Sequence, residues 1–310
     1  MRRLFLKAFL LLLPFAVILG IIEVRLRQIP NSYAATKTEL DKKQAEIEVL
    51  VTGASHAMNG VTPEALSRPA FNIANGSQSL HYDTELVMKY ADSMPKLKLV
   101  VFAISYHSLE YKLSNSIERW RSGFYRQVYG IPGEDGDGGF QLTDYSYIAL
   151  YTPKEAFRQA LGSVTGVNVV NASGETAGDK TAMGEVSDDF GRRRVQLHET
   201  QMRPLDIAAN VSALERACTR LEQKNVAVVF ITIPAHRTYY QRINQDNYQR
   251  MQETTKTIAG KCHAPYLNYL YDQRFADDDF VNSDHLNEKG AAKFTKVLDE
   301  DVVKKYLVDR

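Results

Sequence analysis

A serine and a histidine far apart in the chain are the residues whose types and positions point to catalysis. Ser55 follows the apolar run VLVTG, and His285 lies in the segment NSDHLNEKG ahead of a helical pattern. A serine hydroxyl becomes a nucleophile when a histidine accepts its proton and a third group orients that histidine. The candidates for this third group are Asp284 and Asn282. We predict that these residues form a catalytic site.

Four further candidate residues lie at the carboxyl ends of the second and third predicted strands. In open parallel sheets, ligands bind beyond the carboxyl ends of the strands. Backbone N–H groups at such a place stabilise the oxyanion of an acyl-transfer intermediate. The candidates for oxyanion and substrate contacts are Asn75, Gly76, Tyr106 and His107. The alternative for them is an ordinary role in turns and loop packing.

The elements that must position these residues alternate between strand and helix patterns. Five short apolar runs predict strands, several of them apolar on both faces as in a buried parallel sheet. They are Ile47–Gly53, Ala70–Asn75, Lys98–Ser105, Val226–Pro234 and Ala264–Leu270. Helical patterns cover Tyr82–Met94, Pro204–Lys224, Asn247–Lys261 and Glu288–Tyr306. The alternation predicts an α/β fold with a doubly wound parallel sheet.

The segment from about 106 to 202 interrupts this alternation and is predicted to be an insertion, with a helix at Pro153–Leu161. The arginine run Arg192–Arg194 allows two interpretations. One is a contact with an anionic polymer or lipid headgroup. The other, which we favour, is a solvated loop facing the acidic stretch Ser187–Asp189.

Composition excludes some functions. The chain has 310 residues, 44% of them hydrophobic, and a formal net charge of +1, so it can bury a core but gives no reason to expect nucleic acid as a partner. No histidines or cysteines show metal-site spacing, and no glycine-rich phosphate loop occurs, so we predict no metal and no cofactor. Cys218 and Cys262 either form one disulfide or remain buried thiols.

The amino terminus predicts a membrane anchor. Arg2, Arg3 and Lys7 precede a charge-free apolar run, Ala8–Ile22. With its flanks this run is about long enough to cross a bilayer. A cleaved signal peptide is the alternative, but Glu23 and other polar residues follow the run where small residues would be expected. The preceding basic residues place the amino end in the cytoplasm and the remaining chain outside the cytoplasmic membrane, on its periplasmic or extracellular side.

We therefore predict three regions along the chain. They are an anchor at 1–27, a polar stalk at 28–46, and one α/β domain at 47–310 that contains the insertion.

Two motifs resemble those of a known superfamily. GASHA, Gly53–Ala57, and DHLNEKGAAKF, Asp284–Phe294, are similar to the first and last blocks of the SGNH (GDSL-like) hydrolases. The anchored layout resembles the membrane-tethered DltD-like and polysaccharide O-acetylation-type branch. The resemblance implies a flavodoxin-like three-layer fold, with Ser55 as nucleophile and His285 as base. It also implies an extracytoplasmic O-acyl, in particular acetyl, transferase or esterase acting on a cell-envelope or exported polysaccharide, with a membrane-bound O-acyltransferase as partner.

The sequence departs from this superfamily in two places. Asn282 stands where an aspartate is common, and AISYHS replaces the Gly-x-Asn-Asp block after the third strand. A neutral side chain at 282 would stabilise an imidazolium less well than a carboxylate. The alternative function is therefore a non-catalytic accessory subunit of a membrane-bound O-acyltransferase. A lipase or peptidase of the same fold is a third interpretation.

Overall fold

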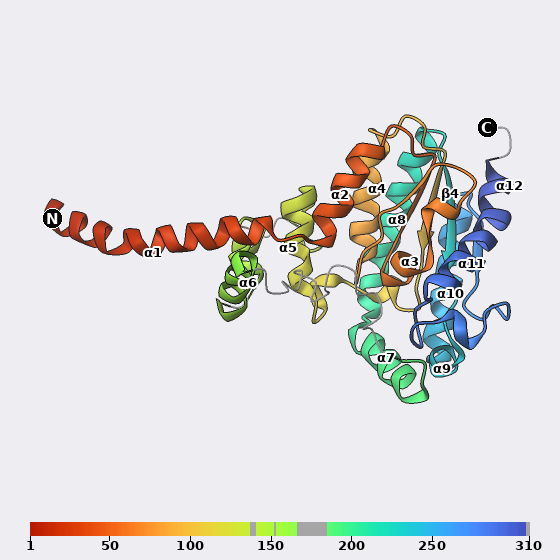
Figure 1. Cartoon of the computed structure of the whole chain (residues 1–310). Coiled ribbons are helices and arrows are strands. Elements are labelled where there is room, and N and C mark those ends of the chain that lie inside the picture. Colours follow the sequence, from red (N-terminus) through yellow and green to blue (C-terminus); the bar gives the residue numbers. More distant parts are fainter. Residues whose placement is uncertain (137–140, 152, 166–184, 308–310) are drawn as a thin grey trace. The chain divides into compact units, whose positions relative to one another are not determined.

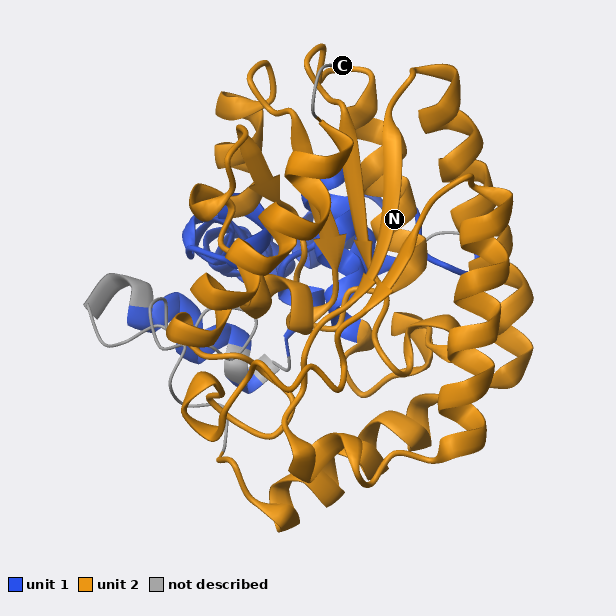
Figure 2. Cartoon of the chain, turned by 90° about the vertical axis from the view of Figure 1, so that its right-hand side faces the viewer, with its two compact units in different colours: residues 1–35, 120–180 blue, residues 36–119, 181–310 orange. Residues whose placement is uncertain are grey.

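The computed structural model describes residues 1–136, 141–151, 153–165 and 185–307. The chain divides into two compact units (Figure 2). The smaller unit comprises residues 1–35 and 120–180, and the larger comprises residues 36–119 and 181–310. The larger unit holds the sheet and both predicted catalytic residues.

Five parallel strands form the sheet of the larger unit, in the order β2-β1-β3-β4-β5 (Figure 1). They are β1 (Val49–Gly53), β2 (Ala70–Asn72), β3 (Leu99–Ala103), β4 (Ala227–Thr232) and β5 (Tyr266–Asn268). This order is the flavodoxin-like one, so the predicted doubly wound fold is confirmed. The chain runs from β1 to β2 on one side and then crosses back to β3 on the other. Ligand sites in such folds lie at this reversal, beyond the carboxyl ends of β1 and β3.

Four of the five strands end earlier than the apolar runs predicted, whereas β1 ends at Gly53 as predicted. β2 ends at Asn72 rather than Asn75, and β3 ends at Ala103 rather than Ser105. Residues 73–75 and 104–105, which were predicted to continue these two strands, instead form loops at the carboxyl edge of the sheet. The residues predicted to bind substrate therefore lie in loops.

Helices cover both faces of the sheet in the larger unit. On one side α4 (Leu80–Ala91) contacts α8 (Ile207–Gln223), which in turn contacts α10 (Gln245–Lys261). On the other side α3 (Ser55–Gly60) packs against α11 (Glu288–Leu298). Figure 1 shows α4 and α8 on one side of the strands and α11 on the other. Helices on both faces of a parallel sheet form the three-layer arrangement that the superfamily resemblance implied.

Alternate residues of the central strands build the core. Val49 and Val51 of β1 lie in one buried cluster with Phe294 and Leu298 of α11. Burying each such side chain contributes about 1.5–3 kcal/mol relative to leaving it exposed. This packing holds α11, and the loop that precedes it, against the strand that leads to Ser55.

Among its described residues, the larger unit also contains four further helices and several short turns. Its other helices, including one shared across the unit boundary, are α2 (Ser32–Lys43), α7 (Asp188–Gln201), α9 (Arg237–Tyr240) and α12 (Lys304–Tyr306). Its short 3-10 and π turns are η1 (Pro63–Ala65), η2 (Ser108–Glu110), η3 (Leu113–Asn115), η8 (Pro204–Asp206), η9 (Asp277–Asp279) and η10 (Asp299–Val303). The predicted helix Glu288–Tyr306 is thus α11, a π turn and α12. In the predicted stalk, α2 has two fully buried side chains, Tyr33 and Leu40.

Cys218 of α8 and Cys262 at the end of α10 form a disulfide, with their Cα atoms 5.5 Å apart. The sequence had left open whether these cysteines form a disulfide or remain buried thiols, and the structure shows the disulfide. The bond joins two neighbouring helices on one face of the sheet.

The smaller unit contains the N-terminal helix α1 (Arg2–Gln28) and part of the insertion. Its other elements are α5 (Ser122–Phe124), α6 (Pro153–Thr165), and the turns η4 (Arg119–Arg121), η5 (Tyr125–Tyr129), η6 (Leu142–Asp144) and η7 (Ile148–Leu150). Among the described residues, α1 is the one helix long and apolar enough to cross a membrane. The predicted helix at Pro153–Leu161 is confirmed as α6, which continues to Thr165.

Candidate active site

Ser55 leaves the sheet through a turn that requires glycine. Gly53 has φ +149°, and a Cβ atom there would lie 2.9 Å from the Cβ of Ala103 on the neighbouring strand. A side chain would therefore collide with β3. Ala54 is the N-cap of α3, and Ser55 is its first residue. The first N–H groups of a helix lack intrahelical partners, so the Ser55 hydroxyl stands beside backbone donors.

The loop before α11 is organised by one amide side chain. Asn282 Oδ1 accepts hydrogen bonds from the backbone N–H groups of Asp284 at 3.0 Å and His285 at 2.9 Å. The Asn282 side chain is buried, so these bonds are shielded from water. The loop conformation that presents His285 therefore depends on residue 282.

The structure brings the predicted serine and histidine into hydrogen-bond distance. His285 Nε2 lies 2.8 Å from Ser55 Oγ. On the other side of the ring, His285 Nδ1 lies 3.1 Å from Asn282 Oδ1 and 3.2 Å from Asp284 Oδ1. The contact with Asn282 has hydrogen-bond geometry, whereas Asp284 Oδ1 has no hydrogen-bond partner among the described residues. Asn282 therefore orients the imidazole, and Asp284 adds a negative charge beside it.

Arg194 of α7 neutralises that carboxylate. Its Nε and one terminal nitrogen each lie 2.9 Å from Asp284 Oδ2. Asp284 is completely buried, and burial alone would raise its pKa. The adjacent His285 ring and the positive charge of Arg194 outweigh this effect and hold the pKa of Asp284 well below its usual range. The carboxylate is thus ionised and able to stabilise an imidazolium on His285.

The arginine run Arg192–Arg194 lies on a helix, so the predicted loop is wrong, although the first two arginines are exposed and face the acidic stretch as predicted. Ser187 caps α7 by accepting a hydrogen bond from Phe190 N at 3.1 Å, which starts the helix just before the run. The first two arginines pair with Asp189 on the helix surface. The third arginine lies on the face that points to the carboxylate, because helical residues turn by about 100° each.

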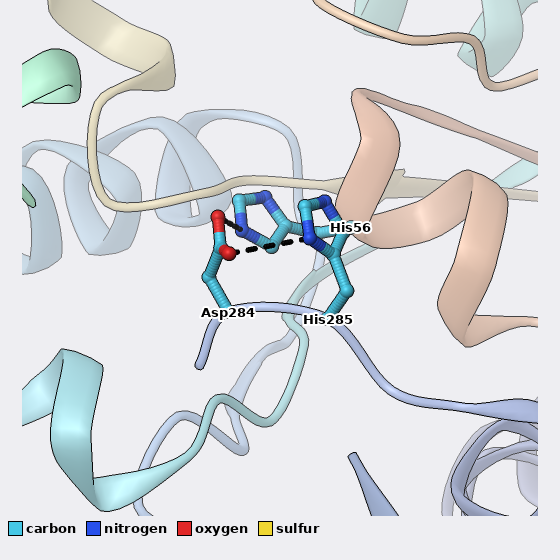
Figure 3. Close-up of side chains that lie close together, drawn as sticks. All are labelled: His56, Asp284 and His285. Atoms are coloured by element: carbon cyan, nitrogen blue, oxygen red, sulfur yellow. Dashed lines mark ion pairs between the residues drawn. The ribbon is translucent and has the colours of Figure 1, made fainter. Parts of the chain in front are cut away.

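A second histidine stands against the same carboxylate. The His56 ring stacks on the His285 ring with centroids 4.9 Å apart and planes within 14°. His56 Nε2 lies 3.6 Å from Asp284 Oδ2, and His56 Nδ1 lies 2.9 Å from Ser105 Oγ. Figure 3 shows Asp284 facing both rings. Burial lowers the pKa of His56, partly offset by the bond to Asp284, so its neutral form is favoured.

Two more buried histidines extend this cluster. His107 stacks on His198 of α7 with centroids 4.1 Å apart, and His198 Nδ1 lies 2.7 Å from the hydroxyl of Tyr239. Burial lowers the pKa of His107 to about 3 and that of His198 well below its usual value. Both rings are therefore neutral at physiological pH and act as packed, uncharged walls of the cluster.

The predicted substrate contact Tyr106 is engaged inside the protein. Its hydroxyl donates to Glu199 Oε1 at 2.7 Å, and the side chain is buried. With His56, Ser105 and Tyr239 it lines a small, mainly apolar cavity of about 10 Å³, room for about one water molecule. Tyr106 and His107 thus lie in the buried interior of the site. Their predicted contact with substrate stays a prediction.

The predicted oxyanion residues lie beside the turn that presents Ser55. Asn75 N donates to Gly53 O at 3.3 Å, which places the loop after β2 next to the end of β1. Gly76 N donates to Asn75 Oδ1 at 2.8 Å. The Gly76 N–H is therefore engaged here, and reaching a substrate oxygen would require the Asn75 side chain to move. Their oxyanion role stays a prediction.

The chemistry of the cluster does not favour a metal ion. His56, Asp284 and His285 have ligand atoms within 4.8 Å of one another, a proximity that sequence spacing did not suggest. The stacked, nearly parallel rings direct their nitrogen lone pairs side by side, whereas a tetrahedral ion needs them to converge. Arg194 already supplies a cation to Asp284. The arrangement suits proton transfer, and the expectation of no metal stays a prediction.

Sequence reasoning identified Ser55, His285, Asn282 and Asp284 but missed Arg194 and assigned no role to His56. Two signals were present. Arg194 and His198 are four residues apart and so share one face of a helix. His56 directly follows the proposed nucleophile.

No family model and no curated protein sequence matches this chain. Solved structures that resemble it include a protein described as an acylhydrolase from Bacteroides fragilis, at 10% identity and a TM-score of 0.42, covering 89% of this chain and 96% of that one. A GDSL-like lipase from Bacteroides thetaiotaomicron matches at 11% identity and a TM-score of 0.42, covering 89% of this chain and 98% of that one. At these values the likeness is too distant to inform the activity of this chain.

Proposed function

We propose that this protein is a serine-dependent acyl transferase or esterase. The observation that carries the proposal is the contact of 2.8 Å between His285 Nε2 and Ser55 Oγ. Asn282 Oδ1 is an acceptor beside Nδ1, which selects the tautomer with its proton on Nδ1 and leaves Nε2 able to accept from Ser55. Ser55 is partly exposed to solvent, as a nucleophile that a substrate must reach has to be.

The proposed reaction has two steps. Ser55 Oγ transfers its proton to His285 Nε2 and attacks the ester carbonyl, and the bond to the leaving oxygen then breaks as His285 returns the proton to that oxygen. The acyl group is now an ester of Ser55. In the second step an acceptor hydroxyl, or water, gives its proton to His285 and attacks the acyl-serine. The bond between the acyl carbon and Ser55 Oγ then breaks as His285 returns that proton to Oγ, which restores the free serine.

We further propose that this chemistry occurs outside the cytoplasmic membrane on a polysaccharide of the envelope. The apolar helix α1 supports membrane attachment, and the Cys218–Cys262 disulfide is typical of an oxidising compartment. The polysaccharide acceptor, the acetyl group and a membrane-bound O-acyltransferase as partner are suggested by the GASHA and DHLNEKG motifs together with the anchored layout of the chain.

Covalent labelling tests the proposal. The full chain in detergent is treated with a fluorophosphonate, and the adduct is located by peptide mass spectrometry. We expect an adduct on Ser55 that disappears in His285→Ala. An unlabelled Ser55 in a folded protein would contradict the proposal and favour the accessory subunit, for which the neutral Asn282 is the supporting observation.

A further inference from the structure

Helix α6 of the smaller unit presents a face that is both apolar and basic. Phe157 and Leu161 are 59% and 52% exposed, and Lys154 and Arg158 are also exposed. These four residues have the spacing i, i+3, i+4, i+7, which places them on one side of a helix. The buried residues of the helix are Ala156, Gln159 and Ala160. The exposed side therefore carries two large apolar groups flanked by two cations.

The segment before α6 is tied to the end of α1. Glu23 accepts the backbone N–H groups of Tyr147 at 2.9 Å and Ile148 at 3.1 Å. Arg27 donates to Tyr145 O at 2.8 Å. Glu23 directly follows the charge-free run of α1, so residues 145–148 lie at the level where the apolar part of the helix ends.

α6 itself contacts α1, and Figure 1 shows it beside the C-terminal half of that helix. A segment that packs on a membrane-spanning helix near the end of its apolar run lies at the surface of the bilayer. An amphipathic helix with aromatic and aliphatic side chains beside basic ones is the kind that lies in this surface. Leu142 and Tyr145, 59% and 55% exposed, add apolar surface just before it.

We propose that α6 is an interfacial helix that binds the lipid leaflet at the C-terminal end of α1. Phe157 and Leu161 enter the boundary between headgroups and acyl chains, and Lys154 and Arg158 contact lipid phosphates. The inference rests on α1 crossing the membrane, which is part of the proposed function, but it is independent of the chemistry at Ser55. It gives the chain a second contact with the membrane.

Tryptophan fluorescence tests the proposal. Trp120 is the sole tryptophan, so Phe157→Trp in a Trp120→Phe background reports on α6 alone. The full chain is reconstituted in vesicles of phosphatidylcholine and phosphatidylglycerol, and membrane insertion of α1 is checked by resistance to carbonate extraction. We expect brominated lipids to quench this tryptophan several-fold more than Leu205→Trp, a matched site in the larger unit that is 93% exposed, and acrylamide to quench it less.

Each other outcome overturns the inference. Free access of acrylamide with no quenching by brominated lipid would place the face in water. Protection from both quenchers would show that protein, such as a second copy of the chain, covers it. Carbonate-extractable protein would contradict the anchor as well, while leaving the labelling of Ser55 unaffected.

The basic residues are tested separately. Lys154→Gln with Arg158→Gln in the Phe157→Trp protein removes both cations and keeps the apolar groups. We expect loss of the extra quenching that phosphatidylglycerol gives over pure phosphatidylcholine vesicles. Unchanged dependence on the anionic lipid would overturn the assignment of these two residues to lipid phosphates.

Discussion

Two serine–histidine pairs meet at one carboxylate in this protein. His285 lies 2.8 Å from Ser55, and His56 lies 2.9 Å from Ser105. Both rings face Asp284, and they stack on each other (Figure 3). By contact distance alone the two pairs are almost the same.

They differ in access and in how each ring is oriented. Ser55 is half-buried, whereas Ser105 is 6% exposed beside a cavity with room for about one water molecule. His285 Nδ1 has the amide oxygen of Asn282 at 3.1 Å, whereas His56 Nε2 stands 3.6 Å from its acid. The comparison teaches that a serine–histidine contact indicates a nucleophile only when a substrate can reach the serine.

The largest effect is expected at Ser55. Ser55→Ala should lower kcat for a small aryl ester by at least ~10³-fold, because the nucleophile itself is removed. Initial rates of ester hydrolysis by the purified full chain measure this. Ser105→Ala is the matched control from the other pair. Equal losses in both variants would break the distinction between the two serines.

Removing the charge beside His285 is expected to be the next largest effect. Asp284→Asn should lower kcat by roughly 10²–10⁴-fold, because a neutral group stabilises the imidazolium poorly. Asn282→Asp, which keeps an oxygen acceptor at that position, is the control and should retain more activity. Circular dichroism must show that Asp284→Asn folds, since it leaves Arg194 without its anion. Full activity of a folded Asp284→Asn would show that Asn282 alone is sufficient.

Replacing Arg194 is expected to change how the activity of the Ser55–His285 pair depends on pH. Arg194→Gln removes a charge that holds the pKa of Asp284 down, so that pKa rises. Because the pKa of Asp284 is lowered in the folded protein, its carboxylate contributes stability and activity that are lost as the pH falls through that lowered pKa. We expect that loss to begin at higher pH in Arg194→Gln, with kcat/KM reduced by about 10-fold. Arg193→Gln, which removes a surface arginine paired with Asp189, is the control; an unshifted acid limb in Arg194→Gln would contradict this role.

The smallest effect is expected at the buried pair. Ser105→Ala removes one hydrogen bond to His56 and should lower the free energy of unfolding by about 1 kcal/mol. Ester hydrolysis should change by less than about 5-fold, since that is the effect on rate of a perturbation below about 1 kcal/mol. Denaturant unfolding and initial rates check the two parts. A loss of activity close to that of Ser55→Ala would make the buried pair part of the reaction.

Local patterns were sufficient for the elements and for two of the site residues. Apolar runs predicted all five strands, because strand formation follows the hydrophobic pattern along the chain. Ser55 and His285 were identified because Ser55 directly follows a well-patterned strand and His285 lies just before a well-patterned helix. The strand ends were less well predicted, since Asn75 and Ser105 belong to apolar-looking runs but turn into loops.

The sequence by itself determined the α/β class, the apolar N-terminal helix and the identities of the proposed nucleophile and base. Only the tertiary structure decided what surrounds them. Ser55 and His285 are 230 residues apart, and Arg194 and Asp284 are 90 apart. Local patterns carry no information on such distances, because the strand order and the packing of α7 bring these groups together. The charge on Asp284 likewise depends on burial and on Arg194, which are properties of the folded chain.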